Sequence, residues 1–215
     1  MSQAVSTRGA APRRKRVNMR PEDRLEDILS VAGPVFAEKG FEAATVEDVT
    51  TAAKIGKGTF YLYFQSKEHL LAVLWSRYVD KYLAATVTII ESSEDWWPTM
   101  DRLAGELVGH AVRNADLHRL VYGSANAKAL ELCRESNRRV IDTIGAFIAR
   151  GAQAGAFQAR DTAITHRMLY FGIVGLLDDL ITRRAEIRAD DLVASALEMV
   201  HRCLGDPAFE ALPAG

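Results

Sequence analysis

Hydroxyl and ammonium groups recur between residues 57 and 67 at a spacing that suits the binding of phosphate oxygens. Lys57 and Lys67 stand at the two ends of this stretch, and Thr59, Tyr61 and Tyr63 lie between them. The phosphate oxygens of a nucleic acid accept hydrogen bonds from side chains of these types. The stretch therefore predicts a helix edge that binds a sugar-phosphate strand.

The elements around these side chains must form two short helices joined by a turn. Thr45 and Asp48 make a Thr-x-x-Asp pattern, which is typical of a helix N-terminus. Residues 54–58 interrupt the helical pattern, and their two glycines permit a sharp reversal. Phe60 and Phe64 are four residues apart, so they share one face and can pack inward. The layout predicts a helix-turn-helix, and a small helical hairpin with exposed tyrosines is the alternative.

The segment from Gly56 to Leu71 resembles the signature of the TetR family of bacterial transcriptional repressors. It reads Gly-Lys-Gly-Thr-Phe-Tyr-Leu-Tyr-Phe-Gln-Ser-Lys-Glu-His-Leu-Leu. The resemblance runs from near Arg24 to near Leu74. It implies that the matching residues touch an operator, and these are Thr45, Gly58, Thr59, Tyr61, Tyr63 and Lys67.

The chain departs from the family pattern in three places, one of which is Thr50 and Thr51 in place of the commoner alanine and a longer polar residue. Lys54 stands where the family usually has glycine, which introduces strain of about 1 kcal/mol if the turn needs a positive φ. His69 stands where a glutamate often completes the cap made by Ser66, so the sequence predicts a weaker cap there.

The charge of the chain is unevenly distributed. The net charge is −1, but basic residues outnumber acidic ones in the first 75 positions and acidic residues outnumber basic ones beyond them. Residues 1–20 are predicted to form a disordered basic arm. This arm either follows the DNA backbone and enters its minor groove or serves as a solubilising tail. The basic residues that begin the chain are Arg8, Arg13, Arg14, Lys15, Arg16, Arg20 and Arg24.

Helical periodicity without strand alternation predicts an all-α fold of about nine helices. We expect a helix-turn-helix DNA-binding domain over residues 21–75, a helical effector-binding and dimerisation domain over 76–205, and a frayed tail over 206–215. The first helix is expected to run from Pro21 to about Lys39, with a kink at Gly33-Pro34. A long helix from Lys67 toward Ile90 joins the two domains, and a loop is expected over 92–98. Further helices are expected near 99–113, 116–123, 125–154, 162–184 and 190–204.

Residues 164–181 are apolar nearly all round, so more than one face of this helix must be buried. Resemblance to the family implies that this helix and the next form a four-helix dimer interface, and a monomeric bundle is the alternative. A homodimer would read a palindrome with half-sites about 34–36 Å apart. The residues expected at the interface are Leu169, Gly172, Ile173, Leu176, Leu180, Leu192, Ala196, Leu197 and Val200.

The second domain also supplies an aromatic and apolar set that suits a mostly hydrophobic small-molecule effector. The effector would release the operator, and residues of an ordinary core are the alternative interpretation. The candidate pocket residues are Trp97, Met100, Leu103, Tyr122, Asn126, Phe147, Met168 and Phe171. Asp178 and Asp179 are expected to pair with Arg183 or Arg184 or to reach solvent, rather than to meet a cationic ligand.

Other chemistry finds little support in the chain. The histidines and cysteines lack zinc-site spacing, so we expect no metal or cofactor, and His110 and His118 are expected to be solvated. Without a nucleophile motif or phosphate loop, an enzyme is not expected. The sequence has no apolar run of about 18 residues, so we expect no membrane span. A reducing cytoplasm is the expected location. Redox sensing through Cys133 or Cys203 and ligand-independent DNA binding are the alternative functions.

Overall fold

The computed structural model describes residues 20–123, 126–186 and 188–207, which form helices and the loops between them. The prediction of an all-α fold with about nine helices is confirmed, because the described residues form nine helices. Most of the predicted basic arm and of the predicted C-terminal tail lies outside those ranges. The helices are α1 (Pro21–Lys39), α2 (Val46–Ala52), α3 (Lys57–Tyr63), α4 (Lys67–Glu91), α5 (Trp96–Arg113), α6 (Ala115–Gly123), α7 (Ala127–Gln153), α8 (Thr162–Thr182) and α9 (Ala189–Leu204).

The first three helices pack around a small aromatic core. α1 begins with Pro21 and has acidic residues in its first turn. The N–H that proline lacks would have no intrahelical acceptor at this position, and the helix dipole favours negative charge there. The helix continues through Pro34 and ends at Gly40, which has a φ of 78°. Phe36 is fully buried, and its ring meets the edge of Phe41 at a centroid distance of 5.2 Å. This core fixes α1 against the two short helices.

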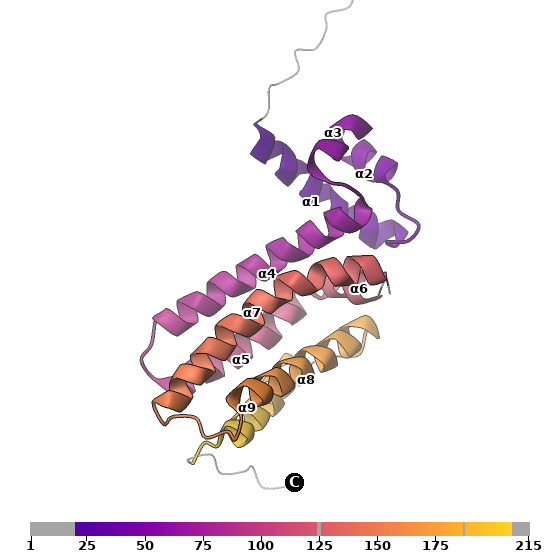
Figure 1. Cartoon of the computed structure of the whole chain (residues 1–215). Coiled ribbons are helices and arrows are strands. Elements are labelled where there is room, and N and C mark those ends of the chain that lie inside the picture. The colour runs from indigo at the N-terminus through magenta and orange to yellow at the C-terminus, as the bar shows by residue number, and fades with distance from the viewer. Residues whose placement is uncertain (1–19, 124–125, 187, 208–215) are drawn as a thin grey trace, which may run out of the picture.

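α4 joins the N-terminal helices to the rest of the molecule (Figure 1). Ser66 caps it by accepting a hydrogen bond from the His69 amide at 3.2 Å. His69 returns a contact of its own, because its Nδ1 atom accepts from the Gln65 amide at 3.1 Å. In a capping box a glutamate at position 69 would accept from the amide of the N-cap residue Ser66. His69 instead accepts from the amide of Gln65, the residue before the N-cap.

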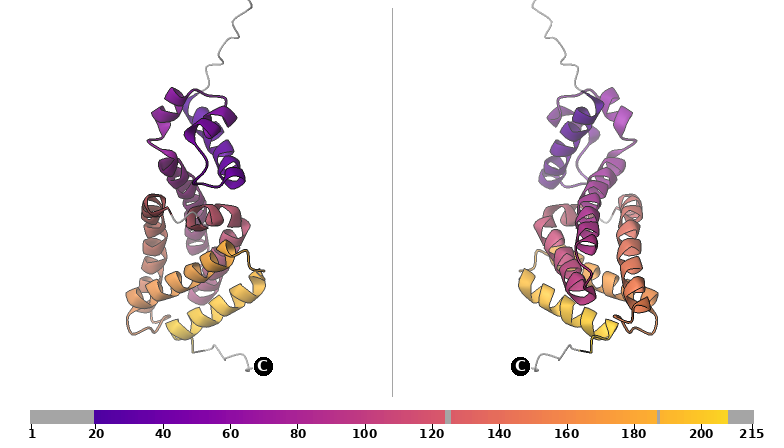
Figure 2. Two further views of the ribbon diagram at one scale, coloured as in Figure 1. Left: turned by 90° about the vertical axis from the view of Figure 1, so that its right-hand side faces the viewer. Right: turned by 90° about the vertical axis from the view of Figure 1, so that its left-hand side faces the viewer.

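The remaining helices pack along the C-terminal part of α4. α7 and α5 lie against α4, α8 packs on α7 and α6, and α9 packs on α5 and α8. Both views in Figure 2 show α1–α3 at one end of the molecule and α9 near the other end. None of the helices in the described ranges is both long enough and apolar enough to cross a membrane.

The boundaries of the predicted helices agree with the structure to within a few residues, except at the expected loop over 92–98. α5 begins at Trp96, after Asp95 at the N-cap position. Pro98 therefore lies in the first turn of the helix, where its missing N–H breaks no intrahelical hydrogen bond.

Candidate nucleic-acid interface and effector cavity

The N-terminus of α2 is held by the predicted capping box. The Thr45 amide donates to Asp48 Oδ2 at 2.9 Å, and the Asp48 amide donates to Thr45 Oγ1 at 3.2 Å. The Lys39 ammonium binds the Asp48 carboxylate. Together with the hydrogen bonds from Thr45, it lowers the pKa of the Asp48 carboxyl to about 2. The Thr45 hydroxyl also donates to Asp48 Oδ2 at 2.8 Å, so its hydrogen is engaged within the cap.

The reversal between α2 and α3 depends on Lys54 rather than on the two glycines that follow. Lys54 has a φ of 54°, in the left-handed region. Gly56 has a φ of −81° at the N-cap of α3, and Gly58 lies inside the helix. The expectation that Gly56 and Gly58 form the reversal is therefore wrong, because neither supplies a positive φ.

Lys54→Gly is expected to raise the free energy of unfolding by about 1 kcal/mol, because glycine adopts a positive φ without the clash that Cβ causes. The midpoint of thermal unfolding should rise by about 2–4 °C. Lys54→Ala is the matched control, because it removes the ammonium group but keeps the Cβ. An equal gain from both variants, measured by circular dichroism on heating, would contradict the strain assigned to Lys54.

The residues of α3 divide into an anchored face and an exposed face. Phe60 and Phe64 are buried with their ring centroids 5.3 Å apart. Tyr61 is 57% exposed and stands edge-on to Phe60 at a centroid distance of 5.4 Å. Thr59 and Tyr63 are half-buried, and a Cβ added at Gly58 would meet open space. The buried pair of rings thus holds a short helix whose outer side is free to meet another molecule.

The lysines at the two ends of this stretch have different surroundings. Lys57 is exposed and forms an ion pair with Glu47 on α2 at 2.8 Å. Lys67 instead directs its ammonium inward, where Nζ donates to the carbonyls of Phe41 at 2.8 Å, Glu42 at 2.9 Å and Ala44 at 3.2 Å. All three ammonium hydrogens of Lys67 have acceptors within the protein, so we correct its expected role from phosphate contact to support for the loop after α1.

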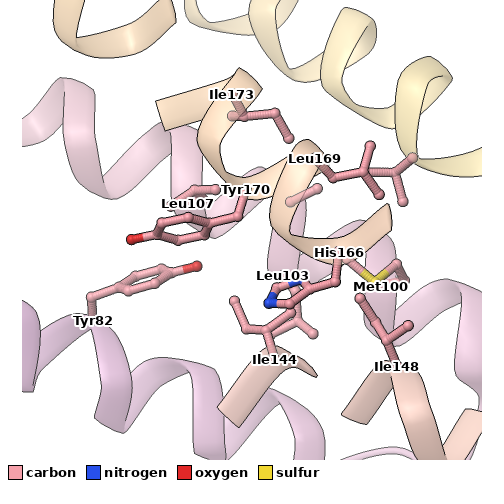
Figure 3. A pocket seen from close by; sticks show the side chains of 12 residues that line it. Tyr82, Met100, Leu103, Leu107, Ile144, Ile148, His166, Leu169, Tyr170 and Ile173 are labelled. Carbon is pink, nitrogen blue, oxygen red and sulfur yellow. The ribbon is translucent and has the colours of Figure 1, made fainter. Parts of the chain in front are cut away.

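Two of the predicted pocket residues line a small cavity between α4, α5, α7 and α8. Met100 and Leu103 lie around this cavity of about 30 Å³, together with residues that the sequence interpretation did not single out, such as Tyr82 (Figure 3). Tyr122 lines a second cavity of about 30 Å³, with Trp75 and Asn137. Tyr82, Leu107 and Tyr170 form part of the wall of both cavities, so the two lie side by side.

The structure places the other predicted pocket residues elsewhere. Trp97 stacks on His201 at 4.7 Å, and Phe147 packs on Trp96 at 5.3 Å. Asn126 caps α7 by accepting from the Ala129 amide at 3.0 Å. These three side chains complete packing or a helix end and do not line either of the two cavities.

Met168 and Phe171 were expected in the pocket but lie on the outside of α8. They are 71% and 56% exposed, next to Ile164 at 58% and Leu176 at 50%. Ile164, Met168 and Phe171 follow one another at four and three residues, so they lie on one side of the helix, whereas Leu176 is turned about 140° from Phe171 and lines the groove toward α9. We call these four exposed apolar residues together the α8 face.

The structure places the predicted interface residues in different surroundings. Leu169, Ile173 and Val200 are buried and line the first cavity, and Ile173 also lines the groove between α8 and α9. A groove of about 180 Å³ runs between α8 and α9, and its lining includes Gly172, Leu176, Leu192 and Ala196. Leu180 and Leu197 are half-buried. The groove continues the α8 face onto α9, because Gly172 and Leu176 belong to α8 and Leu192 to α9.

The expectation that His110 and His118 are solvated is wrong. His118 is 4% exposed, and its Nδ1 and Nε2 atoms each lie 2.7 Å from a partner, Asp178 Oδ1 and the Tyr78 hydroxyl. His110 is 8% exposed, with Nε2 3.2 Å from the Tyr78 carbonyl, and burial lowers its pKa. Asp178 thus meets a histidine, whereas Asp179 pairs with Arg183 at 2.8 Å as expected. Within the part of the chain that the structure describes, no group of three histidine, cysteine or acidic residues could hold a metal ion.

Two short helices joined by a tight turn, with the second held by buried phenylalanines and open on its outer side, define a helix-turn-helix unit. Residues 28–74 match the family model described as "Bacterial regulatory proteins, tetR family". The match assigns this unit of the chain, residues 28–74, to the TetR family.

Curated relatives match only part of this chain. The chain is 32% identical over 99 residues to the uncharacterized HTH-type transcriptional regulator YvdT of Bacillus subtilis, covering 46% of this chain and 51% of that protein. It is 32% identical over 80 residues to the HTH-type transcriptional repressor KstR2 of Rhodococcus jostii, covering 37% and 39% of the two chains. The chain thus spans about half or less of these curated relatives.

Solved structures resemble the whole fold at low sequence identity. The fatty acid degradation regulator FadR of Bacillus halodurans matches with a TM-score of 0.70 and 20% identity over 90% of this chain and 100% of that one. FadR of Bacillus subtilis, solved in complex with stearoyl-CoA, matches with a TM-score of 0.68 and 19% identity over 81% and 96% of the chains. These likenesses show that the chain shares its overall fold with these two structures.

Proposed function

We propose that this protein is a homodimeric DNA-binding transcriptional regulator, a repressor that a mostly hydrophobic small molecule releases from a palindromic operator. The observation that carries the proposal is the exposed side of α3, where Tyr61 and Lys57 extend from a helix anchored by buried phenylalanines. Thr59 and Tyr63, both half-buried, add hydroxyl groups along the same helix. Such groups suit hydrogen bonds to phosphate and to base edges in the major groove.

The dimer is supported by the α8 face and the groove beside it. Four large apolar side chains on one helix are at least half exposed, which is unusual unless another surface covers them. A second copy related by a two-fold axis would place its own α8 and α9 there. Because α8 and α9 lie far from α1–α3, a dimer would keep both DNA-binding units free (Figure 2).

The effector is supported by the position of the cavities beside α4. A molecule that enters between α4 and α8 would move the helix that carries α1–α3. A coupling free energy of roughly 1–3 kcal/mol would weaken operator binding about 5- to 150-fold. KstR2 is named as a repressor, and FadR of Bacillus subtilis is a transcriptional regulator solved in complex with stearoyl-CoA, so each of these two properties has a precedent among similar proteins.

The test is a selection of DNA duplexes from a random library by the purified protein, followed by gel-shift titration of the selected duplex. We expect an enriched inverted repeat that binds one dimer. Enrichment of a non-palindromic site bound by a monomer would overturn the dimer, and failure to enrich any sequence would overturn specific DNA recognition. Operator affinity that no small molecule changes would favour a ligand-independent DNA-binding protein.

The redox alternative depends on Cys203, because Cys133 is enclosed. Cys133 is 1% exposed, and burial raises the pKa of its thiol to about 12, so little reactive thiolate forms. Cys203 is exposed near the end of α9.

Peroxide is expected to leave the operator affinity of the parent and of Cys203→Ser equal, with Cys133→Ser as the matched buried-site control. Gel-shift titration before and after peroxide treatment measures this. Peroxide-driven release that is lost only in Cys203→Ser would establish the redox mechanism instead.

A further inference from the structure

The cavity between α4, α5, α7 and α8 contains a hydroxyl group that lacks a hydrogen-bond partner. Tyr82 is 4% exposed, and among the described residues its Oη atom has no partner. Thr86 lies one turn further along α4, is fully buried, and also has no partner for Oγ1. Burial raises the pKa of the Tyr82 phenol well above its usual value, and the nearby Thr86 side chain only partly opposes that rise, so the phenol keeps its proton. Buried polar groups are nearly always paired, so these two require an explanation.

The Tyr82 hydroxyl is directed into the cavity. Figure 3 shows its ring opposite that of Tyr170, with the hydroxyl pointing away from α4 and toward the side where Leu103 and His166 lie. Most of the surrounding wall is aliphatic, with Met100 and Ile144 among its members. The phenol of Tyr82 is therefore a donor at the edge of an apolar space, and its oxygen becomes accessible only when the cavity widens.

The wall of the cavity carries no full charge among the described residues. It contains no lysine, arginine, aspartate or glutamate. His166 donates from Nε2 to the Ile141 carbonyl at 2.8 Å, and burial lowers the pKa of its ring, so it is neutral at neutral pH. An ionised ligand group would lose its water here without gaining an opposite charge, which is strongly unfavourable.

We propose that this cavity takes an uncharged, mainly aliphatic molecule with one hydrogen-bond-accepting oxygen, such as a ketone or an ester, and that Tyr82 donates to that oxygen. The regulatory consequence rests on the proposed function, whereas the binding itself does not. The ligand oxygen would give the Tyr82 hydroxyl the partner that it lacks. The aliphatic wall would bury the remainder of the ligand.

The cavity must widen to admit such a molecule. Its volume of about 30 Å³ is enough for about one water molecule. Met100 has three rotatable side-chain bonds, and Tyr170 separates this cavity from the second one, so both can move to enlarge the space. Tyr82 belongs to α4 and Tyr170 to α8. A ligand that widens the cavity by pushing these two side chains apart would therefore also push α4 and α8 apart. Ligand entry is thereby linked to the helix that carries α1–α3.

The test is isothermal titration of the full chain with three probes of equal length: 2-octanone, octanoate and octylammonium. We expect 2-octanone to bind at least about tenfold more tightly than either ion. Tyr82→Phe should weaken 2-octanone binding by about tenfold, because the carbonyl then loses its donor. Octanoate or octylammonium binding as tightly as the ketone, undetectable ketone binding, or an unchanged ketone affinity in Tyr82→Phe would each overturn the proposal.

Thr99→Val is the matched control. Thr99 is fully buried on α5 with an unpartnered hydroxyl, but it does not line the cavity. Both variants remove an unpaired buried hydroxyl, so each should raise the thermal midpoint by about 2–4 °C. Only Tyr82→Phe should change ketone affinity, and an equal loss in Thr99→Val would show a general packing effect and overturn the role of Tyr82.

A gel shift on the selected duplex separates this proposal from the proposed function. Absence of DNA binding by the ligand-free chain would contradict the regulator and leave the ketone result standing. DNA binding by a chain that shows no preference for the ketone would contradict only the ligand class.

Discussion

A protein in which Phe171 and Leu176 are both replaced by glutamate is expected to be a monomer that binds operator DNA about 10²–10⁴-fold more weakly than the parent. Both side chains lie on the α8 face, 56% and 50% exposed, so the new carboxylates are solvated in the free subunit and change its stability little. In a two-fold dimer the carboxylates of both subunits would be brought together away from water, which is strongly unfavourable.

Light scattering during size-exclusion chromatography measures the mass, which should fall to that of one 23.7 kDa chain. Leu132→Glu is the control, because it places the same charge on an exposed leucine of α7 that lies outside the α8 face. Circular dichroism should show unchanged helix content in both proteins. A double variant that keeps the mass of two chains would show that the α8 face is not the dimer contact.

Tyr61→Ala is expected to weaken operator binding by about 30-fold or more without unfolding α1–α3. A lost contact of about 1 kcal/mol in each DNA-binding unit amounts to about 2 kcal/mol for the dimer, which is roughly this factor. Lys57→Ala should instead weaken binding to all sequences alike. It should also reduce the slope of log affinity against log salt by about 2, one phosphate contact for each subunit.

Gel-shift titrations at several salt concentrations measure both effects. Lys81→Ala is the control, because Lys81 is exposed on α4 outside the α1–α3 unit. Affinities of Tyr61→Ala and Lys57→Ala that equal those of the control would show that α3 is not the surface that meets DNA.

Local signals in the sequence were enough to predict the N-terminal unit. The capping box of Thr45 and Asp48 and the spacing of Phe60 and Phe64 involve residues three or four apart, and both appear in the structure. Lys67 shows the limit of this reasoning, because its acceptors belong to the loop at residues 41–44, more than 20 positions earlier. A lysine beside a predicted interface gives no sign that carbonyls elsewhere in the fold will bind it.

Some residues of α8 were assigned to the wrong side of the helix for a physical reason. Periodicity identifies the inner side of a helix only when the other side is polar, and α8 is apolar nearly all round. Leu169 and Ile173 were therefore expected at the dimer contact but line the cavity, while Met168 and Phe171 were expected in the cavity but lie outside. Only the packing of α8 on α5, α6, α7 and α9 decides which side is enclosed.

The buried histidines were missed because their partners are distant in the chain. His118 meets Asp178 across 60 positions, and His201 meets Asp101 across 100 positions. Tyr82 was missed for a related reason. A tyrosine on an apolar stripe is an ordinary core residue, and only the coordinates show that its hydroxyl is unpaired.

The length of α4 determines how far a small movement at the cavity displaces the α1–α3 unit. The helix has 25 residues, so it is a rod of about 37 Å, with Tyr82 in its C-terminal half and Lys67 at the opposite end. A swing of about 5° around the Glu91 end would carry the Lys67 end through about 3 Å, which is close to the rise of one base pair, about 3.4 Å. In the proposed dimer, a shift of this size would move the two α3 helices out of register with successive turns of the DNA major groove.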